Sequence, residues 1–293
     1  MPIMPNRLGA RRLSAVAVLF LLLMHVAGCD ADAAPPAAGE SAKAAANTVA
    51  GRVLGQDGNP ITAKGVKYTV VINGISSAGE KIKYTPAVAA DGSWKAELVA
   101  GTYKRPRASL KAPFEEQVFE YELVPSAAEG DFTGADGLVC DVTWKIRDPK
   151  PHHEENAEPG NWTHYFGGML GVTFDRFPEG KPQIPTLGPT GTKLRFTATP
   201  AGKLIDGSDG KPLTFELAYD DLFRQVKPKG LHDLPVARYK VAAVVIAPDG
   251  VEAPLVVRRQ EEKAFHDSVE VSFVGYAGGA EPIGETVFFT LKP

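Results

Sequence analysis

The sequence predicts an all-β protein built from two tandem β-sandwich domains. Apolar and polar side chains alternate with a period of two over many short stretches, and turn residues separate these stretches. The 293-residue chain contains 30 glycines and 24 prolines, which favour short elements and turns over long helices. This length suits two ordinary domains. A hydrophobic content of 44% and a charged content of 23% are typical of a soluble globular body.

The first 28 residues have the composition of an export signal. Three arginines precede an apolar run at residues 13–24, and Val26, Ala27 and Gly28 come directly before Cys29. The run has 12 residues, which is too short to span a bilayer. A basic start, a short apolar run and small residues before a cleavage point are the three parts of a secretory signal. We therefore expect residues 1–28 to be absent from the mature chain.

The stretch that ends in Cys29 resembles the bacterial lipobox, in which the cysteine is lipidated and the signal is cut just before it. The resemblance implies a lipid anchor on Cys29 and a place in the bacterial cell envelope, on the outer face of the cytoplasmic membrane or in the outer membrane. Asp30, directly after this cysteine, resembles the signal that retains a lipoprotein on the inner membrane. A non-lipidated signal that happens to precede a cysteine is the alternative. Residues 29–47 are rich in alanine and proline and predict a flexible tether.

Residues 48–147 are predicted to form the first sandwich. The alternating stretches are residues 66–73, 94–98, 119–123 and 140–146, and turn signals such as Asp91-Gly92 lie between them. Residues 49–61 (VAGRVLGQDGNPI) and 91–110 (DGSWKAELVAGTYKRPRASL) resemble the carboxypeptidase regulatory-like, or prealbumin-like, domain. The resemblance implies a small sandwich that is usually an accessory or adhesive module. Its enzymatic relative, hydroxyisourate hydrolase, uses histidines, and residues 48–147 contain none.

Residues 167–293 are predicted to form a second, prealbumin- or Ig-like sandwich of unassigned topology. The alternating stretches are residues 194–198, 213–219, 239–245, 269–273 and 287–291. Both halves place a Tyr-Lys pair at the start of a strand, at Tyr103 and at Tyr239. This similarity is explained either by a distant internal duplication or by the general preference of strands for tyrosine.

The predicted inter-domain linker, residues 148–166, holds the side chains that could carry chemistry. Imidazole and carboxylate groups can bind Zn²⁺, and the candidates are His152, His153, Glu154 and His164. Their spacing matches no metal motif, so a solvated linker is the alternative. Three aromatic residues in the same segment could bind a ligand or fill the domain joint: Trp162, Tyr165 and Phe166.

The remaining motifs predict no catalytic residue and no cofactor. The loop that holds Asp206, Ser208 and Asp209 lacks the spacing of a calcium loop and is typical of a turn. Cys140 alternates with apolar residues, so we expect it in the core with no disulfide partner. The net charge of −3 gives no indication of a nucleic-acid partner.

Together these features predict a membrane-anchored envelope lipoprotein whose non-catalytic sandwiches bind a protein or a glycan, or serve a structural role. The alternative is an envelope hydrolase or metal-binding protein with a site near the domain joint, at His152, His153 and His164.

Overall fold

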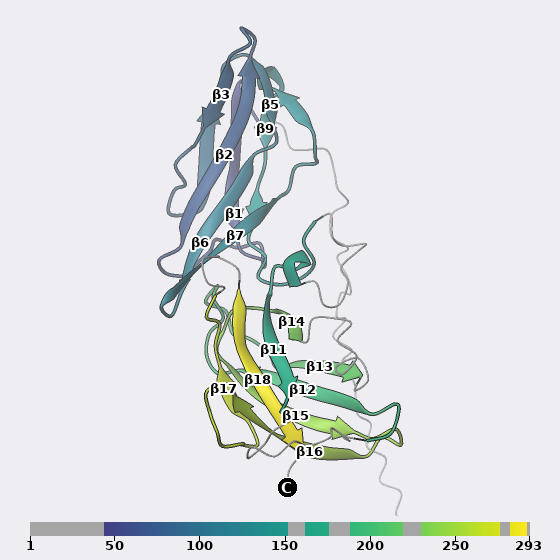
Figure 1. The fold of residues 1–293 in the computed structure, drawn as a ribbon. Helices are drawn as coiled ribbons and strands as arrows, with labels where there is room; N and C mark the ends of the chain where they lie inside the picture. Colours follow the sequence, from purple (N-terminus) through teal and green to yellow (C-terminus); the bar gives the residue numbers. More distant parts are fainter. Residues whose placement is uncertain (1–43, 152–161, 176–187, 219–229, 276–281, 292–293) are drawn as a thin grey trace, which may run out of the picture. The chain divides into compact units, whose positions relative to one another are not determined.

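The computed structural model describes residues 44–151, 162–175, 188–218, 230–275 and 282–291. All of them belong to one compact unit, Ser41–Pro293. Every regular element in these ranges is a strand or a single turn of 3₁₀ helix, so the all-β prediction is confirmed. The strands fall into two hydrogen-bonded groups, which form the two sandwiches (Figure 1). The described part of the chain contains no helix with the length and apolarity of a membrane span.

Ten described strands form the first sandwich, and they follow the order β4-β1-β10-β7-β6-β2-β5-β8, with β3 on β2 and β9 on β1. Their bounds are β1 (Thr48–Leu54), β2 (Lys67–Ser76), β3 (Lys81–Tyr84), β4 (Ser93–Glu97), β5 (Gly101–Lys104), β6 (Arg107–Phe114), β7 (Gln117–Pro125), β8 (Asp131–Thr133), β9 (Leu138–Val139) and β10 (Val142–Thr143). The longest ladder of the first sandwich joins β6 and β7, which run side by side in Figure 1.

The period-two pattern places the predicted residues in the core of the first sandwich. Phe119, Tyr121 and Leu123 of β7 are buried, and the residues between them are exposed. Cys140 is fully buried, as predicted. It lies between β9 and β10, so within the stretch 140–146, which was expected to be one strand, only β10 (Val142–Thr143) is a strand.

Gly51 explains why a glycine stands between the two buried valines of β1. Its backbone passes so close to the next segment that a Cβ atom would collide with the carbonyl of Cys140 and the ring of Trp94. Only glycine permits this approach. The glycine of the Val-x-Gly-x-Val pattern therefore permits the close packing of β1 against the backbone at Cys140 and the ring of Trp94.

Eight described strands form the second sandwich, in the order β13-β12-β15-β16-β18-β11-β14, with β17 on β15. Their bounds are β11 (Gly168–Phe174), β12 (Lys193–Pro200), β13 (Leu213–Ala218), β14 (Gly230–Leu234), β15 (Tyr239–Ile246), β16 (Glu252–Arg259), β17 (Val269–Val271) and β18 (Ile283–Leu291). The predicted inward rows of β12, β15 and β17 are buried. Leu291 was expected to face inward but is 42% exposed, because it lies at the last position of β18, where the core ends.

In each sandwich the first strand pairs in parallel with the last. In the first sandwich β1 pairs in parallel with both β9 and β10. In the second, β11 pairs in parallel with β18 over the register Met169↔Ile283 to Phe174↔Phe289, with one irregularity. The other pairs are antiparallel, as expected where short turns connect neighbouring strands.

The two Tyr-Lys pairs have the same structural role. Tyr103 and Tyr239 are both fully buried, and each hydroxyl donates a hydrogen bond to the carbonyl four residues earlier. The acceptors are Val99 at 2.7 Å and Pro235 at 2.8 Å. This is the tyrosine-corner arrangement, which fixes the turn that leads into a strand of a sandwich. The arrangement accounts for both tyrosines whether or not the halves arose by duplication.

The second sandwich also contains a buried ion pair that the sequence pattern did not indicate. The Arg258 guanidinium donates from Nε and Nη2 to the Asp175 carboxylate, at 3.1 and 2.7 Å. It also lies over the rings of Phe265 and Phe288, at 5.3 and 4.5 Å from their centroids. Its remaining nitrogen donates to backbone carbonyls, including that of Glu262. Arg258 therefore ties the loop after β16 to β11 and β18.

Candidate functional site

The segment between the two sandwiches closes on itself at its base. The amide of Phe166 donates to the carbonyl of Asp148 at 3.0 Å, and the amide of Lys150 donates to the carbonyl of His164 at 2.8 Å. Pro149 and Tyr165 form an isolated antiparallel bridge between these bonds. The two ends of the predicted linker thus lie side by side. The end of the first sandwich at Arg147 and the start of the second at Gly167 are therefore joined across the base of this hairpin.

Asp233 of β14 holds this base in place. Its Oδ1 accepts hydrogen bonds from the amides of Asp148 at 2.8 Å and Gly167 at 3.3 Å, one on each side of the hairpin. Arg147 approaches the other carboxylate oxygen, with Nε 3.6 Å from Oδ2. Desolvation outweighs these contacts and raises the pKa of Asp233 to about 6. The backbone of Asp233 has a positive φ of 59°, an uncommon conformation that carries its side chain at the joint.

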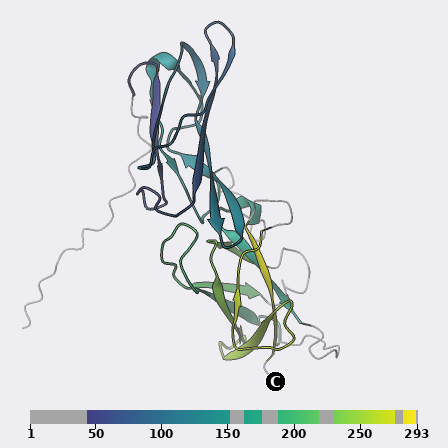
Figure 2. The same cartoon turned by 90° about the vertical axis from the view of Figure 1, so that its left-hand side faces the viewer.

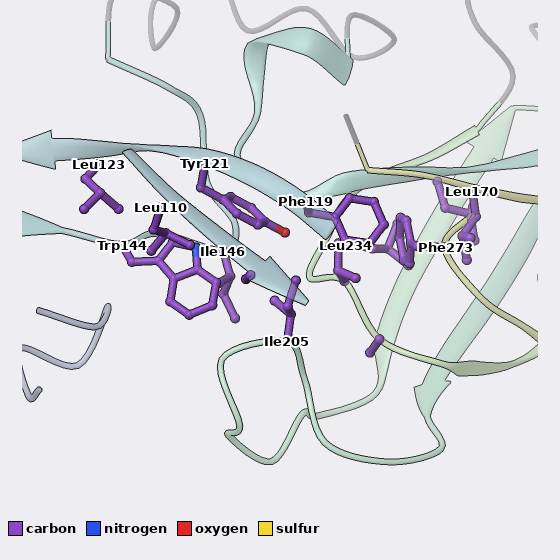
Figure 3. Close-up of a cluster of buried hydrophobic side chains, with 14 of the residues drawn as sticks. Leu110, Phe119, Tyr121, Leu123, Trp144, Ile146, Leu170, Ile205, Leu234 and Phe273 are labelled. Carbon is purple, nitrogen blue, oxygen red and sulfur yellow. The ribbon is translucent and has the colours of Figure 1, made fainter. Parts of the chain in front are cut away.

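An apolar cluster joins the two sandwiches above this base. Phe119, Tyr121 and Ile146 of the first sandwich belong to the same core as residues of the second. Figure 3 shows them beside their neighbours, which are Ile205, Leu234 and Phe273. Such a buried apolar contact stabilises the joint in the way that a domain core does. The hydroxyl of Tyr121 lies in this cluster without a hydrogen-bond partner among the described residues.

The tip of the β6–β7 hairpin reaches the second sandwich (Figure 2), and a polar contact completes the joint there. One oxygen of Glu115 accepts from Nε and Nη2 of Arg238, at 3.2 and 2.7 Å. The other accepts from the hydroxyl of Ser272 at 2.8 Å. Although burial opposes ionisation, these bonds leave the pKa of Glu115 below its usual value. The hairpin tip is therefore fixed to the second sandwich at two points.

A cleft of about 600 Å³ lies beside the joint and is lined by both sandwiches. The first sandwich contributes the turn 55–62 and the residues Trp144, Ile146 and Arg147, and the second contributes the loop 204–213 with Pro235 and Tyr239. This volume lies within the usual range for small-ligand sites. Trp144 is only 1% exposed, so its ring forms a wall of the cleft and offers no free face for stacking.

Turn chemistry shapes the two loops of the cleft. The Asp57 carboxylate accepts from the amide and the side-chain nitrogen of Asn59, which lowers the pKa of Asp57. Asp206 accepts from the amide and hydroxyl of Ser208 through Oδ1. Both are Asx-type turns, as the sequence predicted for the loop at Asp206. Asp209 pairs with Lys203 at 2.6 Å at an exposed position.

The predicted site residues fall into two groups. Cys29, His152, His153 and Glu154 lie outside the described residues, so lipidation and the metal-site hypothesis stay predictions. His164 is half-buried at the hairpin base. Among the described ranges, no group of three or more His, Cys, Asp or Glu side chains has the arrangement of a metal site.

The predicted ligand-binding aromatics differ in accessibility. Phe166 is 4% exposed, so its ring is better suited to filling the joint between the sandwiches than to contacting a ligand. Tyr165 is half-buried and remains a candidate, with a pKa that burial raises. Trp162 lies in a 3₁₀ turn, Trp162–His164. Sequence reasoning missed Asp233 and the cleft, whose loops carry only ordinary turn signals.

The fold and joint of the described residues define an all-β protein with two linked sandwiches and a cleft that both sandwiches line. No family model matches the chain, and no curated protein matches it. Solved structures that align with it include BcpA, the major pilin subunit of Bacillus cereus, at 10% identity over 84% of this chain and 82% of that chain, with a TM-score of 0.20. The major pilin from Streptococcus pyogenes aligns at 12% identity over 84% of this chain and 98% of that chain, with a TM-score of 0.18. At these TM-scores the alignments carry no argument about this chain.

Proposed function

We propose that this chain is a bacterial cell-envelope lipoprotein that is anchored through Cys29 and carries a non-catalytic binding module. The observation that carries the binding role is the joint between the sandwiches. Asp233, Glu115 and the apolar cluster fix the two sandwiches to each other, and they leave a cleft that both sandwiches line. Rigid scaffolds that position loops around a cleft are the usual design of binding proteins.

The anchor rests on the order of parts at the start of the chain, where a basic segment, a short apolar run and small residues lead to Cys29. Lipidated bacterial cysteines carry more than one acyl chain, and two or more chains hold a protein stably on a bilayer. The domain boundaries 48–147 and 167–293, and the membership of the first domain in the carboxypeptidase regulatory-like family, belong to the same proposal. The tether at residues 29–47 would hold the module close to the membrane surface.

Metabolic labelling with radioactive palmitate tests the anchor. The full-length chain, expressed in a bacterial host, should take up label and appear in the membrane fraction. Cys29→Ser should remove the label and leave an uncut precursor. Cys140→Ala is the matched control, because it removes the only other cysteine in the sequence and should leave the label in place. Label that persists in the Cys29 variant would refute the anchor.

A further inference from the structure

The hydrogen-bonding groups of the cleft are only partly used by the protein. Asp206 and Asp209 each engage Oδ1 with a neighbour in their own loop, at Ser208 and Lys203, and keep Oδ2 without a bond to a described residue. Asp57 uses both oxygens on Asn59. The cleft therefore retains free carboxylate acceptors on the side of the second sandwich.

The cleft also retains free donors. Lys211 forms no hydrogen bond or ion pair with any described residue. Arg147 approaches Asp148 and Asp233 with Nε, at 3.9 and 3.6 Å, and its side chain is 42% exposed. Its two terminal nitrogens form no hydrogen bond with a described residue. Donors from both sandwiches thus face the same space as the free acceptors.

The overall balance of the lining disfavours a strongly charged ligand. The lining contains three carboxylates, those of Asp57, Asp206 and Asp209, and two cationic side chains, those of Arg147 and Lys211. An anion would meet the carboxylates, and a metal cation finds no suitable cluster among the described residues. A hydroxyl group both donates and accepts, so it can pair with either kind of free group. The lining also contains apolar side chains, those of Pro60, Ile61, Leu204 and Leu213.

We propose that this cleft binds a neutral carbohydrate. The ring hydroxyls would accept from Arg147 and Lys211 and donate to Asp206 and Asp209, while the C–H faces of the sugar would lie on the apolar surface. The inference rests on the proposed binding role and names the ligand class and the site. It is independent of the lipid anchor, because the cleft lies wholly within the compact unit Ser41–Pro293.

The test is a binding screen on an array of neutral glycans, acidic glycans and peptides, followed by calorimetry on the best ligand. The protein is the 41–293 fragment, which contains every described strand. The variants are Asp206→Asn, which keeps the turn and removes the charge, and Lys211→Gln. Each deletes or weakens one charge-assisted hydrogen bond, so affinity should fall by about tenfold or more.

Matched controls come from two residues of the second sandwich that do not line the cleft. Asp249→Asn alters an Asx turn of the same kind, in which Asp249 accepts from the amide of Val251. Lys240→Gln alters an exposed lysine of β15. Both controls should bind as the parent does. Binding only to acidic glycans or to peptides, binding that survives both cleft variants, or no binding on the array would each overturn the proposal. The palmitate experiment on Cys29 remains valid in every case.

Discussion

Two buried tyrosines lead to opposite predictions for the same substitution. Tyr239 is fully buried and donates to the carbonyl of Pro235 at 2.8 Å. Tyr121 is 4% exposed, and its hydroxyl has no hydrogen-bond partner among the described residues. Replacing either residue by phenylalanine removes one oxygen and preserves the ring. The effect on the free energy of unfolding therefore depends on what the hydroxyl does.

The expected magnitudes follow from the state of each hydroxyl. Tyr239→Phe removes a hydrogen bond and leaves a carbonyl without its donor, which costs about 1–2 kcal/mol. Tyr121→Phe removes a buried polar group without a partner, so the free energy of unfolding should stay unchanged or rise by about 1 kcal/mol. Each kcal/mol of change in the free energy of unfolding shifts the melting temperature by about 2–4 °C in a protein of this length.

Urea denaturation followed by circular dichroism measures both variants, with Tyr68→Phe as a control. Tyr68 is half-buried and its hydroxyl makes no hydrogen bond to a described residue, so its loss should have little effect. Equal destabilisation by Tyr121→Phe and Tyr239→Phe would refute the reasoning, because it would mean that the Tyr121 hydroxyl is also satisfied in the folded protein.

Three further predictions concern the joint and the core. Desolvation raises the pKa of Asp233 to about 6, so between pH 4 and pH 6 the folded chain holds a proton that the unfolded chain has released. The free energy of unfolding should therefore fall by up to about 3 kcal/mol as the pH rises from 4 to 6. Asp233→Asn should flatten this slope in urea titrations at several pH values, and an unchanged slope would exclude Asp233 as its source. Arg258→Ala should cost about 3–5 kcal/mol in the same assay, because it removes the cation that is paired with the buried Asp175 carboxylate, whereas Arg258→Lys should recover only part of the loss. Burial raises the pKa of the Cys140 thiol, so a thiol-specific disulfide reagent should label it only in denaturant, and rapid labelling of the native chain would contradict the core position.

The sequence predicted those parts of the fold that depend on side-chain alternation. The inward rows of β7, β12 and β15 follow directly from the period of two. Strands without that pattern were missed. β11 contains two glycines, β14 is only five residues long, and β16 carries a proline and a continuous apolar run. Each of these strands is defined by its neighbours in the sheet and not by its own sequence.

The candidate site was predicted only in its position near the domain joint. The bonds of Asp233 join it to residues 85 and 66 positions earlier, and no local pattern reports such a pairing. The loops of the cleft were recognised as turns, but the sequence could not reveal that turns from both sandwiches line one space. Long-range contacts of this kind depend on the packing of whole sheets.

The parallel pairing of first and last strands determines how each sandwich bears a pulling force. Since β11 and β18 point in the same direction, the chain enters the sandwich at one end and leaves it at the other. A force applied through the two chain ends then acts along the strands and loads their hydrogen bonds together in shear. Antiparallel neighbours pulled from the same end would instead separate one bond at a time. The pairing of β1 with β9 and β10 gives the first sandwich the same geometry. Tension between the first and last strands of either sandwich would therefore be resisted by several backbone hydrogen bonds at once.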